Sequence, residues 1–278
     1  MSIVQRVCKA LERIAPLRLA EKWDNVGLLL EAPQQRANAN RVLLTIDLTP
    51  AVLVEALSTP TAFIVAYHPT IFKPFSSLTL SNPLQASLLR CAAAGISVYV
   101  PHTALDSVTG GINDWLCLGL NNQIAPPQDN IRFIGEADKD GMGGLGRVIT
   151  FPEPISMSEL QRRIKAHLNV QHIQVAYTPL RDPNVVRSVA VCAGSGGSVL
   201  LGVDADLYFT GEMVHHEVLE AVASGHNVAL CGHTNTERGY LRVLAQKLLP
   251  ELSADASPSE RSLEVHVSKA DEHPLRIV

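Results

Sequence analysis

Short apolar runs of strand length alternate with helical patterns along the first half of the chain. The runs lie at 41–47, 62–68 and 96–102, and the helical patterns at 4–14, 50–57 and 83–94. Pro50 suits the first turn of its helix, and Gly95 closes the third helical pattern. This order of strands and helices predicts a mostly parallel sheet covered by helices.

The second half of the chain continues the alternation after a polar, glycine-rich segment. Strands are expected at 148–151, 172–177, 189–193, 206–210, 228–231 and 263–268, and helices at 158–168, 212–225 and 235–249. The change of composition at 126–146 predicts a seam between two lobes. The polar segments 102–110 and 253–261 are expected to be loops.

Three of the apolar runs end in histidine. His68, His102 and His233 each follow a predicted strand. Ligands of open parallel sheets collect at the carboxyl ends of the strands, so these side chains are candidates for one site. His233 and Glu237 stack on each other if a helix begins near residue 234, and an imidazole with a carboxylate can hold a metal ion. Taken alone, such a pair is more often a simple ion pair.

Two acidic residues lie at predicted strand or loop ends near these histidines. Asp106 follows His102 in a polar loop, and Asp47 follows an apolar run. A carboxylate in either place can bind a metal or cap the next helix. The neighbouring histidines favour the ligand role for Asp106, whereas capping is the more common use for Asp47.

Further polar motifs accompany the later strands. The turn Gly194–Gly197 can offer backbone N–H groups to a phosphate, but it lacks the spacing of a dinucleotide or P-loop motif, so a tight turn is the default. Glu212 and His215 have the Glu-x-x-His spacing of di-iron bundles, but the second copy that such bundles need is missing. Glu212 is therefore placed beside a site, while His167 and His172 are expected at the surface.

The composition and charge of the chain argue against several classes of protein. The net charge of −4 and the lack of a dense Lys/Arg run argue against a dedicated nucleic-acid or membrane-surface binder. Five scattered cysteines without C-x-x-C spacing indicate reduced thiols. No signal peptide or bilayer-spanning window is recognised. We expect a soluble, cytoplasmic protein; a mitochondrial or nuclear pool stays open.

Several motifs, in this order, resemble the NIF three-like family, which is also classed as GTP cyclohydrolase I type 2-like. The resemblance covers nearly the whole chain. The motifs are Trp23-Asp-Asn-Val-Gly27, Tyr67-His-Pro69, His102-Thr-Ala-Leu-Asp106, Thr210-Gly-Glu-Met-Val-His-His216, His233-Thr-Asn-Thr-Glu-Arg238 and Ser268-Lys-Ala-Asp-Glu-His-Pro274.

The resemblance implies a fold of two interlinked α/β lobes with mixed, mostly parallel sheets and a metal site in the cleft between them. We expect residues 1–125 with 227–278 in the first lobe and 126–226 in the second. The resemblance also implies a ring-like homohexamer. Long members carry an inserted domain for which 126–189 leaves no room, so the chain is similar to the compact form.

The implied metal ligands are His68, Asp106, His233 and Glu237, the residues that the spacing selects. Many members have two adjacent histidines where this chain has Tyr67 and His68. Tyr67 or His102 can stand in for the missing ligand, and whether the site holds one ion or two stays open. Two histidines and two carboxylates suit zinc, iron or manganese.

The expected activity is metal-dependent hydrolysis of a nucleotide or another phosphate-bearing small molecule. Glu212 and Tyr67 are candidates for proton transfer, and Arg238 with Gly194, Gly196 and Gly197 for substrate binding. The alternative is a ring-shaped regulatory protein with a structural or vestigial metal and partners that include transcriptional regulators. The missing histidine favours this alternative slightly.

Overall fold

The strands and helices fold into two compact units in the computed structural model, which describes residues 1–135, 143–254 and 262–277. One unit comprises Met1–Leu105 with Tyr240–Val278, and the other comprises Asp106–Gly239. The expected α/β class with two mixed sheets is confirmed.

The units divide the chain at places that differ from the expected lobe boundaries. Segments 106–125 and 227–239 belong to the second unit. The physical reason is pairing and packing: helix α5 (Ile112–Leu120) packs on strands β6 and β8, and strand β10 (Asn227–Leu230) pairs with strand β9, all of them in the second unit.

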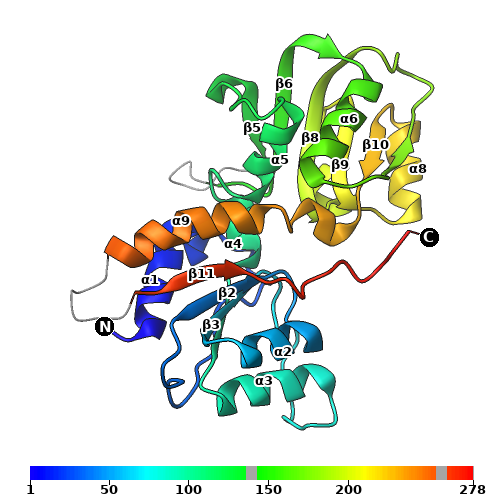
Figure 1. Ribbon diagram of the computed structural model, residues 1–278. Helices are drawn as coiled ribbons and strands as arrows, with labels where there is room; N and C mark the ends of the chain where they lie inside the picture. The colour runs from blue at the N-terminus through cyan, green and yellow to red at the C-terminus, as the bar shows by residue number, and fades with distance from the viewer. Residues whose placement is uncertain (136–142, 255–261, 278) are drawn as a thin grey trace. The chain divides into compact units, whose positions relative to one another are not determined.

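The first unit is built on a five-stranded sheet in the order β1-β4-β3-β2-β11, seen in the lower part of Figure 1. Its strands are β1 Gly27–Leu30, β2 Arg41–Thr45, β3 Thr61–Ala66, β4 Ser97–Val100 and β11 Glu264–Val267. All neighbours run parallel except β1, which pairs antiparallel with β4 at one edge. Because β3 and β4 are parallel neighbours, the residues after them meet at one edge of the sheet.

Helices cover both faces of this sheet. α1 (Ile3–Ile14) packs on α9 (Tyr240–Ala254), while α2 (Pro50–Ser58) packs on α3 (Pro83–Ala93) against the other face (Figure 1). Local chemistry sets the starts of the helices. Ser2 and Gln5 form a capping box, Thr49 accepts a hydrogen bond from the Val52 N–H, and Asn82 caps α3.

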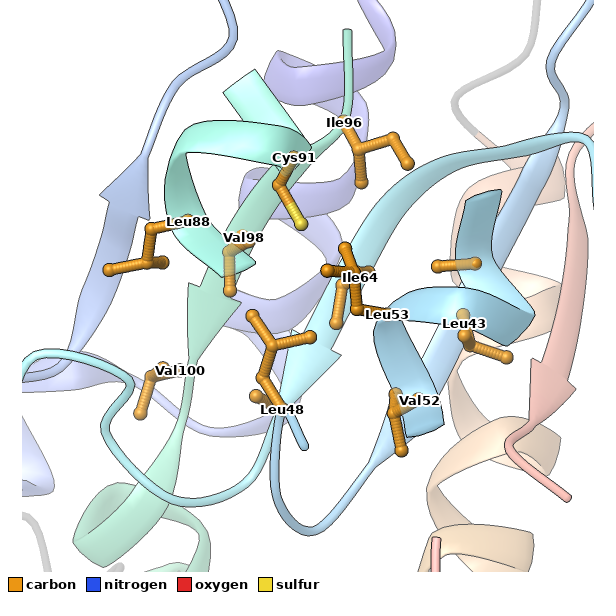
Figure 2. Packing of buried hydrophobic residues seen from close by; sticks show 12 residues of the cluster. Leu43, Leu48, Val52, Leu53, Ile64, Leu88, Cys91, Ile96, Val98 and Val100 are labelled. Carbon is orange, nitrogen blue, oxygen red and sulfur yellow. The ribbon is translucent and has the colours of Figure 1, made fainter. Parts of the chain in front are cut away.

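Side chains from three parallel strands and two helices fill the core between the sheet and α2 and α3. Figure 2 shows Leu43, Ile64 and Val98 of the sheet facing Leu53 of α2 and Cys91 of α3. Ile64 is fully buried, so truncating it to alanine would cost about 2–5 kcal/mol of stability. This core fixes the strands that lead to His68 and His102.

The second unit is built on a six-stranded sheet in the order β5-β6-β8-β9-β10-β7. Its strands are β5 Ile131–Ile134, β6 Gly146–Ile155, β7 Gln174–Ala176, β8 Val186–Ser195, β9 Leu207–Glu212 and β10 Asn227–Leu230. The central strands β8, β9 and β10 are parallel, and the outer pairs are antiparallel. The ends of the three parallel strands therefore lie at one edge.

Helices and short turns complete the second unit. They are α5 Ile112–Leu120, α6 Met157–Leu168, α7 Gly197–Leu200 and α8 His215–Ala223, with single 3₁₀ turns η2 Gln128–Asn130 and η3 His233–Thr236. Ser156 caps α6 by accepting a hydrogen bond from the N–H of Glu159. Fully buried Arg147 pairs with Asp114 of α5 and donates to the carbonyls of Ser107 and Val108. It fixes the chain just after Asp106.

Several segments differ from the sequence prediction. Residues His102–Ser107, expected as a loop, form helix α4. Glu212 ends strand β9 rather than beginning a helix, so it does not stack with His215. α9 continues to Ala254 with Pro250 inside it, because Leu248 and Leu252 are buried on one side. Within the described residues, no helix is both long and apolar enough to cross a membrane.

Parts of two expected segments lie outside the described residues. They are 136–142, within the glycine-rich seam, and 255–261, within the expected loop before β11.

Candidate functional site

His68 of the first unit is held by the end of the neighbouring strand. Its backbone N–H donates to the carbonyl of Ile46 at 3.0 Å, and its Nδ1 lies 2.9 Å from Oδ1 of Asp47. Asp47 therefore orients a histidine, while Thr49 caps the following helix. An ionised carboxylate only accepts hydrogen bonds, so beside it Nδ1 is the donor, and in the neutral imidazole Nε2 then keeps its lone pair.

His102 has the same arrangement with a buried partner. Its Nδ1 lies 2.8 Å from both carboxylate oxygens of Asp24, which also accept hydrogen bonds from the Thr103 N–H and hydroxyl. Burial by itself raises the pKa of Asp24, but the hydrogen bonds from His102 and Thr103 outweigh it and bring that pKa below its usual value. Asp24 therefore stays ionised and holds the imidazole in one tautomer.

Tyr67 completes a group of three rings at this edge of the first sheet. Its ring centroid lies 5.0 Å from that of His68 and 5.4 Å from that of His102, and the two imidazoles lie 5.6 Å apart. Tyr67 is buried. The first unit thus presents two oriented imidazoles with a tyrosine ring beside both.

His233 and Glu237 meet at the carboxyl edge of the second sheet. The chain turns after β10 at Gly232 and enters η3, which brings Nε2 of His233 to 3.3 Å from Oε1 of Glu237. Nδ1 of His233 lies 2.9 Å from Oε1 of Glu212. With Nδ1–H donated to Glu212, the lone pair on Nε2 faces a carboxylate oxygen. A cation between the two atoms, either a second ring proton or a metal ion, would satisfy both.

Two glycines make room for this pair. Gly194 has φ +64°, and a Cβ at this position would lie 2.6 Å from Oε1 of Glu237 and 2.9 Å from Nε2 of His233. A Cβ on Gly211 would lie 2.8 Å from the Cα of His233. The backbone therefore forms a close cradle around the two donor atoms. Glu237 is only 1% exposed, and buried carboxylates in proteins are usually paired with a cation or bound to a metal.

Asp106 lies near the same strand end of the second unit. Burial raises the pKa of the Cys192 thiol, and the negative charges of Asp106 and Glu237 raise it further. Both carboxylates therefore lie close to Cys192 on β8. Buried Asn113 donates to the carbonyl of Asp106 at 3.1 Å and accepts from the N–H of Ala193 at 2.9 Å. It ties Asp106 to the strand that carries Gly194.

A family model described as Duf34/NIF3 (NGG1p interacting factor 3) matches residues 2–274. The chain belongs to this family. It is 45% identical to the Protein NIF3 homolog of Schizosaccharomyces pombe, over 99% of this chain and 98% of that protein. It is 39% identical to the NGG1-interacting factor 3 of Saccharomyces cerevisiae, over 99% and 96% of the two chains.

Solved structures share the fold of this NIF3-family chain. The hypothetical protein SA1388 of Staphylococcus aureus superposes with a TM-score of 0.80, at 22% identity and over 99% of both chains. This likeness confirms the α/β fold.

The predicted substrate-binding residues have other partners in this NIF3-family chain. Arg238 donates through Nη1 to the hydroxyl of Thr234 at 2.8 Å. A Cβ on Gly196 would meet the Thr210 side chain, and one on Gly197 would meet the carboxylate of Glu217. A carboxylate at Gly197 repels phosphate, so this end of the turn is unsuited to an anion, and the tight-turn interpretation describes it better.

The remaining histidines are distributed differently from the sequence prediction. His172 is exposed, as expected. His167 is half-buried rather than fully exposed: its ring lies 4.2 Å from that of Trp115, and burial lowers its pKa to about 4. The His167 ring can pack closely against α5 because residue 119 is glycine. A Cβ at Gly119 would clash with that ring.

Two residues that shape the candidate sites were missed by sequence reasoning. Asp24 belongs to the Trp-Asp-Asn-Val-Gly motif but acts on a histidine 78 positions later. Asn113 acts across 80 positions on Ala193. Glu212, already expected beside a site, lies 2.9 Å from Nδ1 of His233 through its Oε1. The position of Asp24 inside a motif is a sequence signal for such a role.

Proposed function

We propose that this protein is a metal-dependent hydrolase acting on a nucleotide or another phosphate-bearing small molecule. One observation carries the proposal: His68, His102 and His233 are each held through Nδ1 by a carboxylate. This is the arrangement by which proteins orient metal-binding histidines, because it leaves the Nε2 lone pair for the metal.

The donor set fits a divalent metal. We propose that His68, His233 and Glu237 supply donor atoms to it. We propose that Asp106 joins them and that His102 serves a second ion. Imidazole and carboxylate donors together suit zinc, iron or manganese. The Gly194 cradle supports a role for His233 and Glu237, since the backbone leaves no room for a larger residue beside them.

In this mechanism the bound metal supplies Lewis acidity toward the substrate and toward water. The protein's own residues orient and exchange protons. Asp24 and Asp47 keep the protons of their histidines on Nδ1. Glu212 does the same for His233, and its 56% exposed side chain can pass protons to solvent. The buried Tyr67 hydroxyl is the proposed proton donor to the leaving group.

The test combines metal content with turnover. Metal per chain and hydrolysis of GTP, other nucleotides and simple phosphate esters are measured for the wild type and for the double variant His233→Ala, Glu237→Ala. The matched control replaces Glu264 and His266, an exposed pair with Oε2 and Nε2 2.9 Å apart. We expect loss of metal and of activity in the site variant alone. Equal rates in site variant and wild type would overturn the hydrolase.

A second candidate is a non-catalytic interaction protein, and two observations favour it. The family resemblance implies a histidine where this chain has Tyr67, and one relative bears the name NGG1-interacting factor 3. We propose for this case a homohexameric ring with a structural metal and a protein partner, such as one in transcription. Metal binding without turnover, and a hexamer by light scattering that dissociates when metal is chelated, would support it over the hydrolase.

A further inference from the structure

Two large aromatic side chains are exposed beside His102 in the first unit. The side chain of Trp23 is 62% exposed and that of Phe72 is 60% exposed. Their ring centroids lie 6.1 Å apart, and the Trp23 ring also lies 6.1 Å from the His102 ring at 79°. These two residues, named here the aromatic ledge, therefore adjoin an imidazole that a carboxylate holds in place.

The backbone around the ledge is fixed. Asp24, next to Trp23, is bound by His102 and Thr103. Asn25 donates through Nδ2 to the carbonyl of Ile71 at 2.6 Å, which links the Trp23 segment to the residue before Phe72. The rings are thus exposed on a pinned backbone rather than on a loose loop. A preorganised aromatic surface loses little conformational entropy when a ligand binds to it.

The other tryptophan shows what a purely structural role looks like in this fold. Trp115 stacks against His167 with ring centroids 4.2 Å apart, and a Cβ on Gly239 would touch its ring. Trp23 has no comparable enclosure, because most of its surface is open. Adjacent exposed aromatic rings are the usual surface for stacking a planar ring, and each stacked base contributes about 1–3 kcal/mol.

We propose that Trp23 and Phe72 stack the planar heteroaromatic ring of the substrate and hold its reacting part toward His102. The proposal rests on the proposed hydrolase and names the chemical class of its substrate. Lys73, which directly follows Phe72 and is exposed, supplies a positive charge for a phosphate attached to that ring.

The experiment uses tryptophan fluorescence, because the chain has two tryptophans. In the Trp115→Phe variant all tryptophan emission comes from Trp23. This variant, with and without added metal, is titrated with guanosine monophosphate and with ribose 5-phosphate, which lacks the ring. We expect saturable quenching by guanosine monophosphate alone. No quenching, or equal quenching by both compounds, would overturn the proposal.

A direct binding measurement tests the aromatic ledge independently of the hydrolase proposal. Equilibrium dialysis of guanosine monophosphate with the full chain is expected to show about 5–150-fold weaker binding for Trp23→Ala, and near wild-type binding for Trp23→Phe and for the control Tyr177→Ala. Unchanged binding in Trp23→Ala, with or without a change in oligomeric state, would overturn the ledge. Binding that depends on Trp23 without any hydrolysis supports the ledge and overturns only the hydrolase.

Discussion

The two units present histidines by the same contact but support it differently. In the first unit His102 is held by Asp24, whose side chain is 0% exposed and accepts hydrogen bonds from two residues. In the second unit His233 is held by Glu212, whose side chain is 56% exposed. The His102 imidazole of the first unit is therefore fixed through the interior, whereas His233 of the second unit relies on a close backbone at Gly194 and Gly211.

This difference indicates where each unit is vulnerable. A buried carboxylate contributes to folding and to the site together, because removing it leaves buried donors without an acceptor. An exposed carboxylate can be replaced by water. In the second unit the backbone conformation positions the histidine instead, and a single added methyl group would disturb that conformation.

The largest expected effect compares the two orienting carboxylates directly. Asp24→Ala should lower the free energy of unfolding by about 3 kcal/mol, because the His102 and Thr103 donors lose a buried charged acceptor. Glu212→Ala should cost less than about 1 kcal/mol. Urea unfolding of metal-free protein measures both. Equal losses in the two variants would remove the contrast between the units.

The next effect tests the backbone cradle of the second unit. Gly194→Ala should destabilise the protein by more than about 2 kcal/mol and weaken metal binding at least about tenfold, because positive φ and the approach to Glu237 both oppose a Cβ. Gly202→Ala is the matched control: it has φ +81° but no atom within 4 Å of the added Cβ. Thermal unfolding and metal titration should show the loss of metal only for Gly194→Ala.

A third prediction concerns acid and the second unit. Burial lowers the pKa of His167 to about 4. As the pH falls from about 6.5 to 4, this histidine therefore binds a proton in the unfolded chain but not in the folded chain. Stability should be complete above pH 6.5 and fall by about 2 kcal/mol across this window.

The His167→Phe variant keeps a ring against Trp115 and removes the titrating group. Its stability should change less between pH 6.5 and 4 than that of the wild type, as measured by urea unfolding at a series of pH values. His172→Phe, at an exposed position, should leave the wild-type profile unchanged. A wild-type profile in His167→Phe would show that another group causes the acid loss.

The smallest expected effect tests a long-range anchor in the first unit. Oδ2 of Asp271 accepts a hydrogen bond from the N–H of Ile46 at 2.9 Å, and the Ile46 carbonyl accepts from the N–H of His68. Asp271→Ala should cost about 1.5 kcal/mol and weaken metal binding about tenfold. Asp271→Asn should restore most of both losses, and exposed Glu272→Ala should change neither. If metal titration does not distinguish these variants, Asp271 contributes to folding and not to metal binding.

Much of the fold was predictable because local chemistry and periodicity agree. The capped starts at Thr49 and Ser156 and the apolar runs before His68, His102 and His233 follow local rules, and the structure confirms each of these elements. Helix α4 was missed because His102–Ser107 is one short turn after a strand, without a cap signal. Glu212 was placed on a helix because its spacing to His215 is helical, although pairing of β9 with β8 extends the strand through it.

The orienting partners were harder to predict because they are far away in the sequence. Asp24 reaches His102, and Asp271 bonds Ile46, whose carbonyl accepts from His68, only after the sheet of the first unit has formed. No local pattern distinguishes such a carboxylate from a helix cap. Gly194 shows the same limit: its position after a strand suggested phosphate binding, while the space beside it is taken by His233 and Glu237.

The sequence by itself determined the α/β class, the family, and histidines at the ends of strands, because these depend on periodicity and on motifs of neighbouring residues. The tertiary structure alone decided which carboxylate holds each histidine, that Glu237 is buried against a glycine, and that Trp23 and Phe72 form one exposed ledge. These features depend on contacts between residues 21 to 78 positions apart, and such contacts exist only once the sheets have brought the strand ends together.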